Sequence, residues 1–335
     1  MRHISTLWLI FILPSVALGQ LFPALGGQRA GISALTFLKM DVSPRSAALA
    51  SANICLTGDG YSTYTNPATL SETENFSLAA ANTFWAAGIN YAFLSASRET
   101  KAGHFGLSVS ALNSGRMEVR TAFQPEGTGE YFYANYFTAG LTYSRQLTDQ
   151  FSWGLSAKFV QERLAEFTAN TGVLDLGFLY RTDVKDLRFA VMVQSFGPRS
   201  TLRGEFDRDT TFNNRPISLE SYPAPTVFKL GISMVPWKKD DDSQSLTTLL
   251  QLNHPNDNAE NLRFGLEYQY KHLLFLRAGY KINVDDQNLP TAGIGLRMRI
   301  GRHPVMFDYA FDPMRYLGVV NRIGLSVQFN GMDRE

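Results

Sequence analysis

Apolar and polar residues alternate along most of this sequence after residue 74. In FSWGLSAKF (151–159), Phe151 and Trp153 fall on one side of the alternation, and Ser152 and Lys158 fall on the other. Successive side chains of a β-strand point to opposite faces, so a period of two predicts strands with one apolar and one polar face. The same pattern recurs in 260–270, 290–301 and 320–329. The sequence therefore predicts an all-β fold.

Fourteen segments are predicted to be strands. They are 75–82, 86–94, 102–112, 134–147, 150–163, 171–181, 187–195, 225–236, 245–254, 260–270, 273–281, 290–301, 304–311 and 320–329. Many are 9–12 residues long. That length exceeds the usual strand of a β-sandwich and suits a strand that crosses a bilayer at a tilt. An even number of antiparallel strands is also typical of outer-membrane barrels.

The links between these segments alternate in length. Thr148-Asp149, Lys271-His272 and Arg302-His303 are very short links, whereas 113–133 and 196–224 are long. Outer-membrane barrels have short turns at the periplasmic end and longer loops at the outer end, which is the alternation seen here. Three links depart from it: 95–101, 237–244 and 83–85.

We therefore predict a 14-stranded antiparallel transmembrane β-barrel over residues 74–330, followed by a tail over 331–335. Trp153 and Tyr268 lie near strand ends, where aromatic girdles would meet the two membrane interfaces. The alternative is a large barrel or sandwich in water. Such a protein would also alternate, but its polar face would be outside.

The first 19 residues have the pattern of a secretory signal peptide. A short basic start that includes Arg2 is followed by an apolar run and by the small-x-small pattern Ala17-Leu18-Gly19. Cleavage is expected near Gly19-Gln20. The alternative is an uncleaved anchor helix, but the apolar run is shorter than the roughly 20 residues that a membrane span needs.

The composition argues against several kinds of function. The net charge of +1 gives no reason to expect nucleic-acid binding, which needs a basic patch. The one cysteine, Cys55, excludes an internal disulfide and a zinc knuckle, and we expect it to be buried and inert. His104 shares a polar strand face with Ser108 and Ser110, which is a weak candidate for a Ser/His pair. We expect no enzyme activity, no cofactor and no metal site.

The polar face of the strands carries charges of both signs. Acidic and basic residues on neighbouring strands can pair, which favours a salt-bridged lumen that supports the barrel or holds a plug. A selective channel is the alternative, but a channel more often has a ring of one sign. The expected lumenal charges are Lys158, Arg181, Lys229, Arg263, Arg277, Lys281, Arg297, Arg299, Arg322, Glu162, Asp175, Glu267 and Asp308.

Residues 20–73 lack the alternation. Ser43 is a candidate N-cap with Pro44 at the first helical position, and a run of small residues follows. Asn66-Pro67 marks a second short helical start. This segment is long and apolar, and its small side chains allow close packing. We therefore expect it to be buried inside the protein. We predict a partly helical hatch, or plug, in the lumen of the barrel.

The stretch FLKMDVSPRSAALASANICLTGDGYSTYTNPATL (37–70) resembles the N-terminal signature of the PorV/PorQ outer-membrane proteins. The residues that carry the resemblance are Phe37, Leu38, Arg45, Asp59, Asn66, Pro67 and Ala68. The C-terminal strands look similar too. The resemblance implies a FadL-like barrel of fourteen strands with an N-terminal hatch, in the outer membrane of a Gram-negative bacterium of the Bacteroidetes.

The resemblance also implies a non-enzymatic role in type IX secretion. Its partners would be outer-membrane lipid and proteins of the translocon or the surface attachment complex. The long outer loop offers candidate contact residues: Arg199, Arg203, Arg208, Arg215 and Pro216.

The alternative function is FadL-like transport of hydrophobic small molecules. It requires an apolar pocket under the outer loops. The residues expected to line that pocket are Phe123, Tyr131, Phe132, Tyr133 and Phe137.

Overall fold

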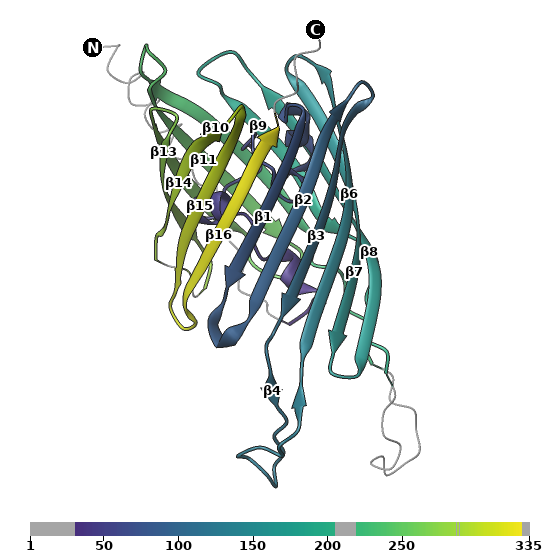
Figure 1. The fold of residues 1–335 in the computed structure, drawn as a ribbon. Helices are drawn as coiled ribbons and strands as arrows, with labels where there is room; N and C mark the ends of the chain where they lie inside the picture. Colours follow the sequence, from purple (N-terminus) through teal and green to yellow (C-terminus); the bar gives the residue numbers. More distant parts are fainter. Residues whose placement is uncertain (1–30, 205–218, 286, 288, 330–335) are drawn as a thin grey trace, which may run out of the picture.

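The computed structural model describes residues 31–204, 219–285, 287 and 289–329. Fourteen strands form one closed antiparallel barrel, which closes where β16 (Gly318–Phe329) pairs with β1 (Phe76–Phe84) (Figure 1). The predicted fold class is confirmed. The predicted signal peptide, its cleavage site and the tail 331–335 lie outside the described residues.

The remaining strands follow one another around the ring in chain order. They are β2 (Asn90–Thr100), β3 (Gly103–Asn113), β6 (Ala134–Thr148), β7 (Phe151–Leu164), β8 (Phe167–Arg181), β9 (Arg188–Phe196), β10 (Val227–Lys238), β11 (Gln244–Pro255), β12 (Asn261–Tyr270), β13 (Leu274–Ile282), β14 (Thr291–Ile300) and β15 (His303–Met314). Two short strands, β4 (Met117–Glu118) and β5 (Tyr131–Phe132), form a hairpin outside the ring.

Two predicted strands begin at the wrong residue. β2 begins at Asn90 and runs on to Thr100, because Ala87 and Gly88 adopt positive φ in the short helix η3 (Ala86–Gly88). Alanine seldom adopts that conformation, so the apolar run there looked like a strand. β8 begins at Phe167, four residues earlier than predicted. The apparent loop 95–101 is therefore mostly strand.

The two ends of the barrel differ, as the link lengths predicted. The turns 101–102, 149–150, 271–273 and 301–302 lie at one end, where β1 begins and β16 ends. We call this the short-turn end. The opposite end, which we call the loop end, carries the links 114–133 and 197–226. The β4–β5 hairpin extends from the loop end, at the bottom of Figure 1.

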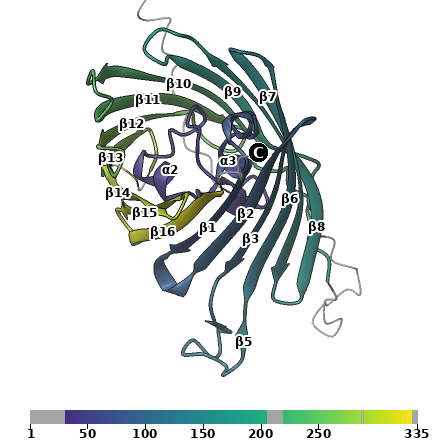
Figure 2. The same ribbon diagram turned by 45° about the horizontal axis from the view of Figure 1, so that its top comes forward.

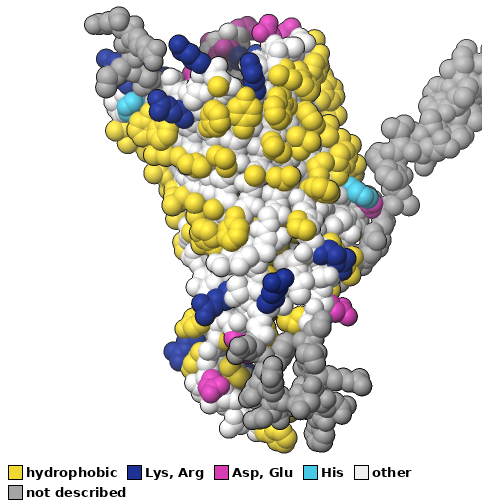
Figure 3. Space-filling view, turned by 90° about the vertical axis from the view of Figure 1, so that its right-hand side faces the viewer, with side chains coloured by type: hydrophobic (Ala, Val, Ile, Leu, Met, Phe, Trp, Pro, Cys, Tyr) yellow, Lys and Arg dark blue, Asp and Glu magenta, His cyan; other side chains and the backbone are white. Residues whose placement is uncertain are grey.

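The outer face of the wall is apolar. Outward-facing side chains such as Leu94 and Leu107 are about 60% exposed. A large contiguous apolar surface of this kind marks a site of contact with a membrane or with another protein. On the face in Figure 3, hydrophobic side chains form a broad band with charged side chains above and below it. Aromatic rings meet near the short-turn end, where Tyr143 packs against Phe105 and Trp153.

The helices formed by residues 36–72 lie inside the ring of strands (Figure 2). They are four short helices: η1 (Thr36–Lys39), α2 (Pro44–Ala48), α3 (Ser62–Thr65) and η2 (Pro67–Glu72). We call residues 31–73 the hatch. None of the helices in the described residues has the length and apolar character needed to cross a membrane.

The register of β1 and β16 allows a test of barrel closure. Ala79 and Ser326 are directly paired and both are buried. Cysteines at these two positions should form a disulfide on mild oxidation, seen as a mobility shift on non-reducing gels. The control pair Ala79→Cys with Gln328→Cys is one diagonal step away, at roughly 7–8 Å between Cα atoms, and should not link efficiently. Equal linking of both pairs would contradict this register.

Candidate functional site

The hatch presents an apolar side to one part of the wall. Phe37, Leu38 and Tyr64 pack into a buried cluster with Tyr91 and Phe93 of β2. Wall residues further round the ring also join this cluster: Ala79, Ala81, Leu112, Val160 and Val173. Strands β1, β2, β3, β7 and β8 supply the part of the lumen that contains this cluster. We call it the apolar half, although the buried ion pair between Lys158 of β7 and Asp175 of β8 also lies within it.

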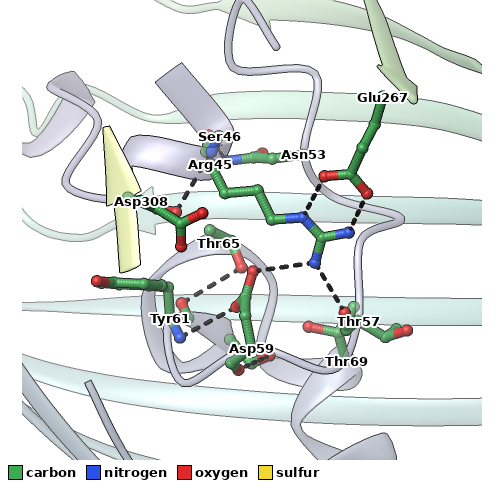
Figure 4. A network of polar contacts seen from close by, with 12 residues as sticks. Arg45, Ser46, Asn53, Thr57, Asp59, Tyr61, Thr65, Thr69, Glu267 and Asp308 are labelled. Carbon is green, nitrogen blue, oxygen red and sulfur yellow. Dashed lines mark hydrogen bonds and ion pairs between the residues drawn. The ribbon is translucent and has the colours of Figure 1, made fainter. Parts of the chain in front are cut away.

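A charged network on the other side of the hatch is centred on Arg45. Its guanidinium donates to both carboxylate oxygens of Glu267 on β12, at 2.9 Å from Nε and 2.6 Å from Nη2. Nη1 donates to the Thr57 carbonyl at 3.1 Å and lies 3.5 Å from an Asp59 carboxylate oxygen. Figure 4 shows these contacts converging on one side chain. Two-pronged pairing of this kind fixes orientation as well as distance.

The network extends along the wall through Arg277 of β13. The Arg277 guanidinium donates from Nε to Glu267 at 2.6 Å and from Nη1 to Asp308 of β15 at 2.5 Å. Asp312 of β15 pairs with both Lys281 and Arg322 on this side of the barrel. A separate buried ion pair joins Lys158 of β7 to Asp175 of β8. These ion pairs match the predicted salt-bridged lumen that holds a plug.

Burial shapes the electrostatics of the hatch. Burial alone would lower the pKa of Arg45, but the carboxylates of Glu267 and Asp59 raise it above its ordinary value. Burial also raises the pKa of Asp59, although Arg45 opposes that shift. Burial raises the pKa of the Cys55 thiol to about 12, which keeps it protonated and unreactive. Arg45 thus remains a permanent cation, with Glu267 as its main counter-ion.

Wall glycines let the hatch backbone approach the strands. A Cβ built on Gly279 would lie 2.5 Å from the carbonyl carbon of Leu49, and one on Gly231 would lie 2.6 Å from Cγ1 of Ile54. Both separations are too short for real atoms, so only glycine fits while the hatch occupies its place. Other wall glycines in similarly close contact with the hatch are Gly106, Gly154, Gly177, Gly293 and Gly324.

The residues that carry the family resemblance occupy defined positions in the hatch. Phe37 and Leu38 are buried in η1, and Arg45 lies in α2 behind the N-cap Ser43. Asn66 caps η2 by accepting from the Ala68 amide at 3.0 Å, and it donates to the Ile54 carbonyl at 2.7 Å.

The predicted starts of both short helices are confirmed. Pro44 begins α2 and Pro67 begins η2, which is a 3₁₀ helix. The η2 helix packs most closely against β6, β7 and β8, toward their short-turn ends.

A cavity of about 380 Å³ lies at the loop end, between the start of the hatch and the wall. We call it the loop cavity. It is lined by Ala34, Glu162, Ser200, Leu202, Leu219, Glu220 and Tyr222. Its lining is mostly apolar, which is typical of a small-molecule site. Sequence reasoning placed Glu162 in the lumen but did not identify the cavity, because the residues that close it come from distant segments.

The prediction of which residues line a pocket under the outer loops is only partly correct. Tyr131, Phe132 and Tyr133 line a second cavity of about 820 Å³ beside the β4–β5 hairpin, with Arg163 and Glu166 on its edge. Phe123 is 96% exposed, and Phe137 points out of the barrel. Both of those residues were wrongly assigned to the pocket, since a loop tip and an outward strand position cannot face the lumen.

The candidate partner-binding residues fall into two groups. Arg199 is exposed and donates through Nε to the Ser221 hydroxyl at 2.9 Å, while Arg203 bonds through its backbone to Thr168. The other three, Arg208, Arg215 and Pro216, lie outside the described residues.

The weak Ser/His candidate does not form a pair. In the described part of the chain, Nδ1 of His104 has no hydrogen-bond partner. That same part contains no group of three or more His, Cys, Asp or Glu side chains placed to hold a metal ion.

No family model matches the sequence, and no curated protein matches it. Solved structures with a similar fold do exist. The Ralstonia pickettii toluene transporter TbuX aligns with a TM-score of 0.56 and 13% identity, covering 85% of this chain and 96% of its own.

Two further barrels align to a similar extent. The Pseudomonas putida toluene transporter TodX aligns with a TM-score of 0.55 and 13% identity, over 85% of this chain and 96% of its own. The monoaromatic hydrocarbon channel CymD aligns with a TM-score of 0.54 and 12% identity, over 87% and 98%. At these identities the likeness shows a shared fold.

The close approach at Gly279 predicts a selective effect on the hatch. Gly279→Val should displace Leu49 and Ala50, with an overpacking cost of about 1–3 kcal/mol. We expect faster cleavage of the hatch by trypsin in the folded barrel. The matched control is Ala278→Val, whose side chain faces outward and is exposed. Equal protease resistance of the two variants would show that the hatch does not press on this wall.

Removing Arg45 should loosen the charged side of the hatch. Arg45→Ala leaves Asp59 without its cation and removes two bonds to Glu267. Breaking a buried ion pair typically costs about 3–5 kcal/mol. The expected readout is a lower temperature for heat-induced unfolding on gels. Lys239→Ala is the control, because the Lys239–Asp241 pair is about half exposed, and it should leave that temperature unchanged.

Proposed function

We propose that this chain is a FadL-like barrel that carries hydrophobic small molecules across an outer membrane. The observation that supports it most directly is the loop cavity of about 380 Å³, which opens beside the apolar half of the lumen. The charged half is cross-linked to the hatch through Arg45 and Glu267. A hydrophobic molecule would therefore travel along the apolar half.

An aromatic track leads from the cavity into the barrel. Tyr136 lies directly across from Glu162 in the β6–β7 register. The Tyr136 ring centroid is 4.7 Å from that of Phe37, which lies 6.4 Å from Tyr91. Further rings follow at Phe93 and Tyr64. Phe37 and Tyr64 belong to the hatch and pack against the rings from the wall, so passage requires the hatch or these side chains to move.

The apolar outer wall supports a place in the membrane. Strands of 9–15 residues are long enough to cross a bilayer at a tilt, and their outward side chains would contact outer-membrane lipid. The short-turn end would then face the periplasm and the loop end the outside. The signal-peptide pattern in residues 1–19 is consistent with this route.

The fold comparisons favour transport over the alternatives. TbuX and TodX are described as toluene transporters, and CymD as a monoaromatic hydrocarbon channel. These proteins share a fold with this chain, and a shared fold does not specify a substrate. The substrate class is therefore inferred from the lining of the loop cavity.

Filling the loop cavity tests the proposal. Cells that lack their own hydrocarbon channels and express the protein should take up labelled toluene faster than cells with an empty vector. Ala34→Trp places an indole in the cavity and should return uptake to the vector level. Ala102→Trp, in an exposed turn at the other end, is the control. No uptake above vector would reject transport of toluene-like molecules, and an unaffected Ala34→Trp variant would reject this route.

A second candidate function is the type IX secretion role that the resemblance implies. The PorV/PorQ-like motif and the projecting β4–β5 hairpin favour it, since Phe123 at the hairpin is almost fully exposed and available to a protein partner. Partners would be translocon or attachment-complex proteins of a Bacteroidetes-type cell.

Deleting the gene provides the test of this second candidate. Surface delivery of type IX cargo should fall, and the wild-type gene should restore it. A gene lacking residues 119–130 should restore toluene uptake but not cargo delivery. Normal delivery in the deletion strain would remove this candidate.

A further inference from the structure

The loop cavity has a one-sided charge. Ala34, Leu202 and Leu219 provide apolar surface. The polar groups in the lining are the carboxylates of Glu162 and Glu220 and the hydroxyls of Ser200 and Tyr222. None of the described lining residues is a lysine or arginine. The cavity therefore offers hydrogen-bond acceptors and negative charge to whatever enters it.

Within the described residues, neither carboxylate pairs with a cation, although the Tyr136 hydroxyl forms a hydrogen bond with Glu162. Among the described residues, no lysine or arginine nitrogen lies within 4.0 Å of an oxygen of Glu162 or Glu220. Arg199 lies nearby but bonds to the hydroxyl and carbonyl of Ser221. Tyr222 donates weakly to Glu220 at 3.4 Å. The acidic character of the cavity thus remains available to a ligand.

A carboxylate in an apolar site discriminates strongly between polar groups. An ammonium or hydroxyl donor on a bound molecule would replace the water that solvates the carboxylate, and hydrogen bonds to charged groups are the stronger ones. A carboxylate ligand would be repelled, and repulsion between like charges increases as water is excluded. Specificity then comes from the repulsion of a ligand carboxylate as much as from the hydrogen bond to a ligand ammonium or hydroxyl.

We propose that the loop cavity selects apolar molecules that carry an amine and rejects those that carry a carboxylate. Glu162 and Glu220 bind the ammonium group, and the apolar lining beside Leu202 and Leu219 holds the hydrocarbon part. An alcohol, which can donate but has no charge, is intermediate. This selection rests on the proposed function, because it concerns molecules that enter the transport route.

Three ligands with one ring skeleton test the selection: benzylamine, benzyl alcohol and benzoate. Their dissociation constants are measured at pH 7 by calorimetry, with the full chain in nanodiscs of zwitterionic lipid and empty nanodiscs as the blank. Benzylamine should bind about tenfold or more tighter than benzoate, with benzyl alcohol between them.

Neutral variants identify the groups responsible. Glu162→Gln and Glu220→Gln should each reduce the ratio of benzylamine to benzoate affinity severalfold, and the double variant should bring it near one. Benzyl alcohol affinity should stay within about twofold, since the cavity keeps its shape. Glu166→Gln is the matched control, because Glu166 lines the second cavity and not this one.

The outcomes separate this inference from the proposed function. If benzoate binds as tightly as benzylamine, or the double variant keeps the wild-type preference, the charge selection is wrong while transport of toluene stands. If none of the three ligands binds but toluene uptake is intact, the selection is also wrong. If ligand binding and toluene uptake are both absent, the charge selection and the proposed transport function are both wrong. Heat-induced unfolding on gels confirms that each variant remains folded.

Discussion

The interior of a wide barrel has to be filled, and the rest of this structure depends on how that is done. A ring of eight strands can be filled by its own side chains, but fourteen strands enclose more space than their side chains can occupy. Here the hatch supplies the missing core. It is held by the paired bonds between Arg45 and Glu267 and by wall glycines such as Gly279, which let its backbone approach the strands.

The two sides of the hatch have different consequences. Ion pairs that include Arg45, Glu267 and Arg277 are directional, so they hold the hatch in one orientation against β12 and β13. On the other side, Phe37 and Tyr64 make aromatic contacts with the wall, which contribute mainly through buried apolar area. The hatch thus has one side held by ion pairs and one side packed through aromatic rings, and the loop cavity lies beside the aromatic side.

Most of the wall could be predicted from the sequence because alternation is a local property. Side chains of a strand change face at every residue, so the pattern in β7 or β16 shows both the strand and its apolar face. The starts of β2 and β8 were wrong where local conformation departs from residue preference, as at Ala87. The N-caps Ser43 and Asn66 were visible for the same local reason, since each acts on amides two or three residues away.

Local patterns along the chain were enough to predict the strands, their apolar faces, the contrast between short turns and long loops, and the caps of the hatch helices. Which charges pair, where glycine is required and where a cavity remains depend on how the chain folds in three dimensions. Arg45 and Glu267 are 222 residues apart, and the loop cavity joins Ala34 to Glu162 and Tyr222. Such contacts depend on how the closed ring brings distant strands around the hatch, and no periodicity along the chain encodes that distance.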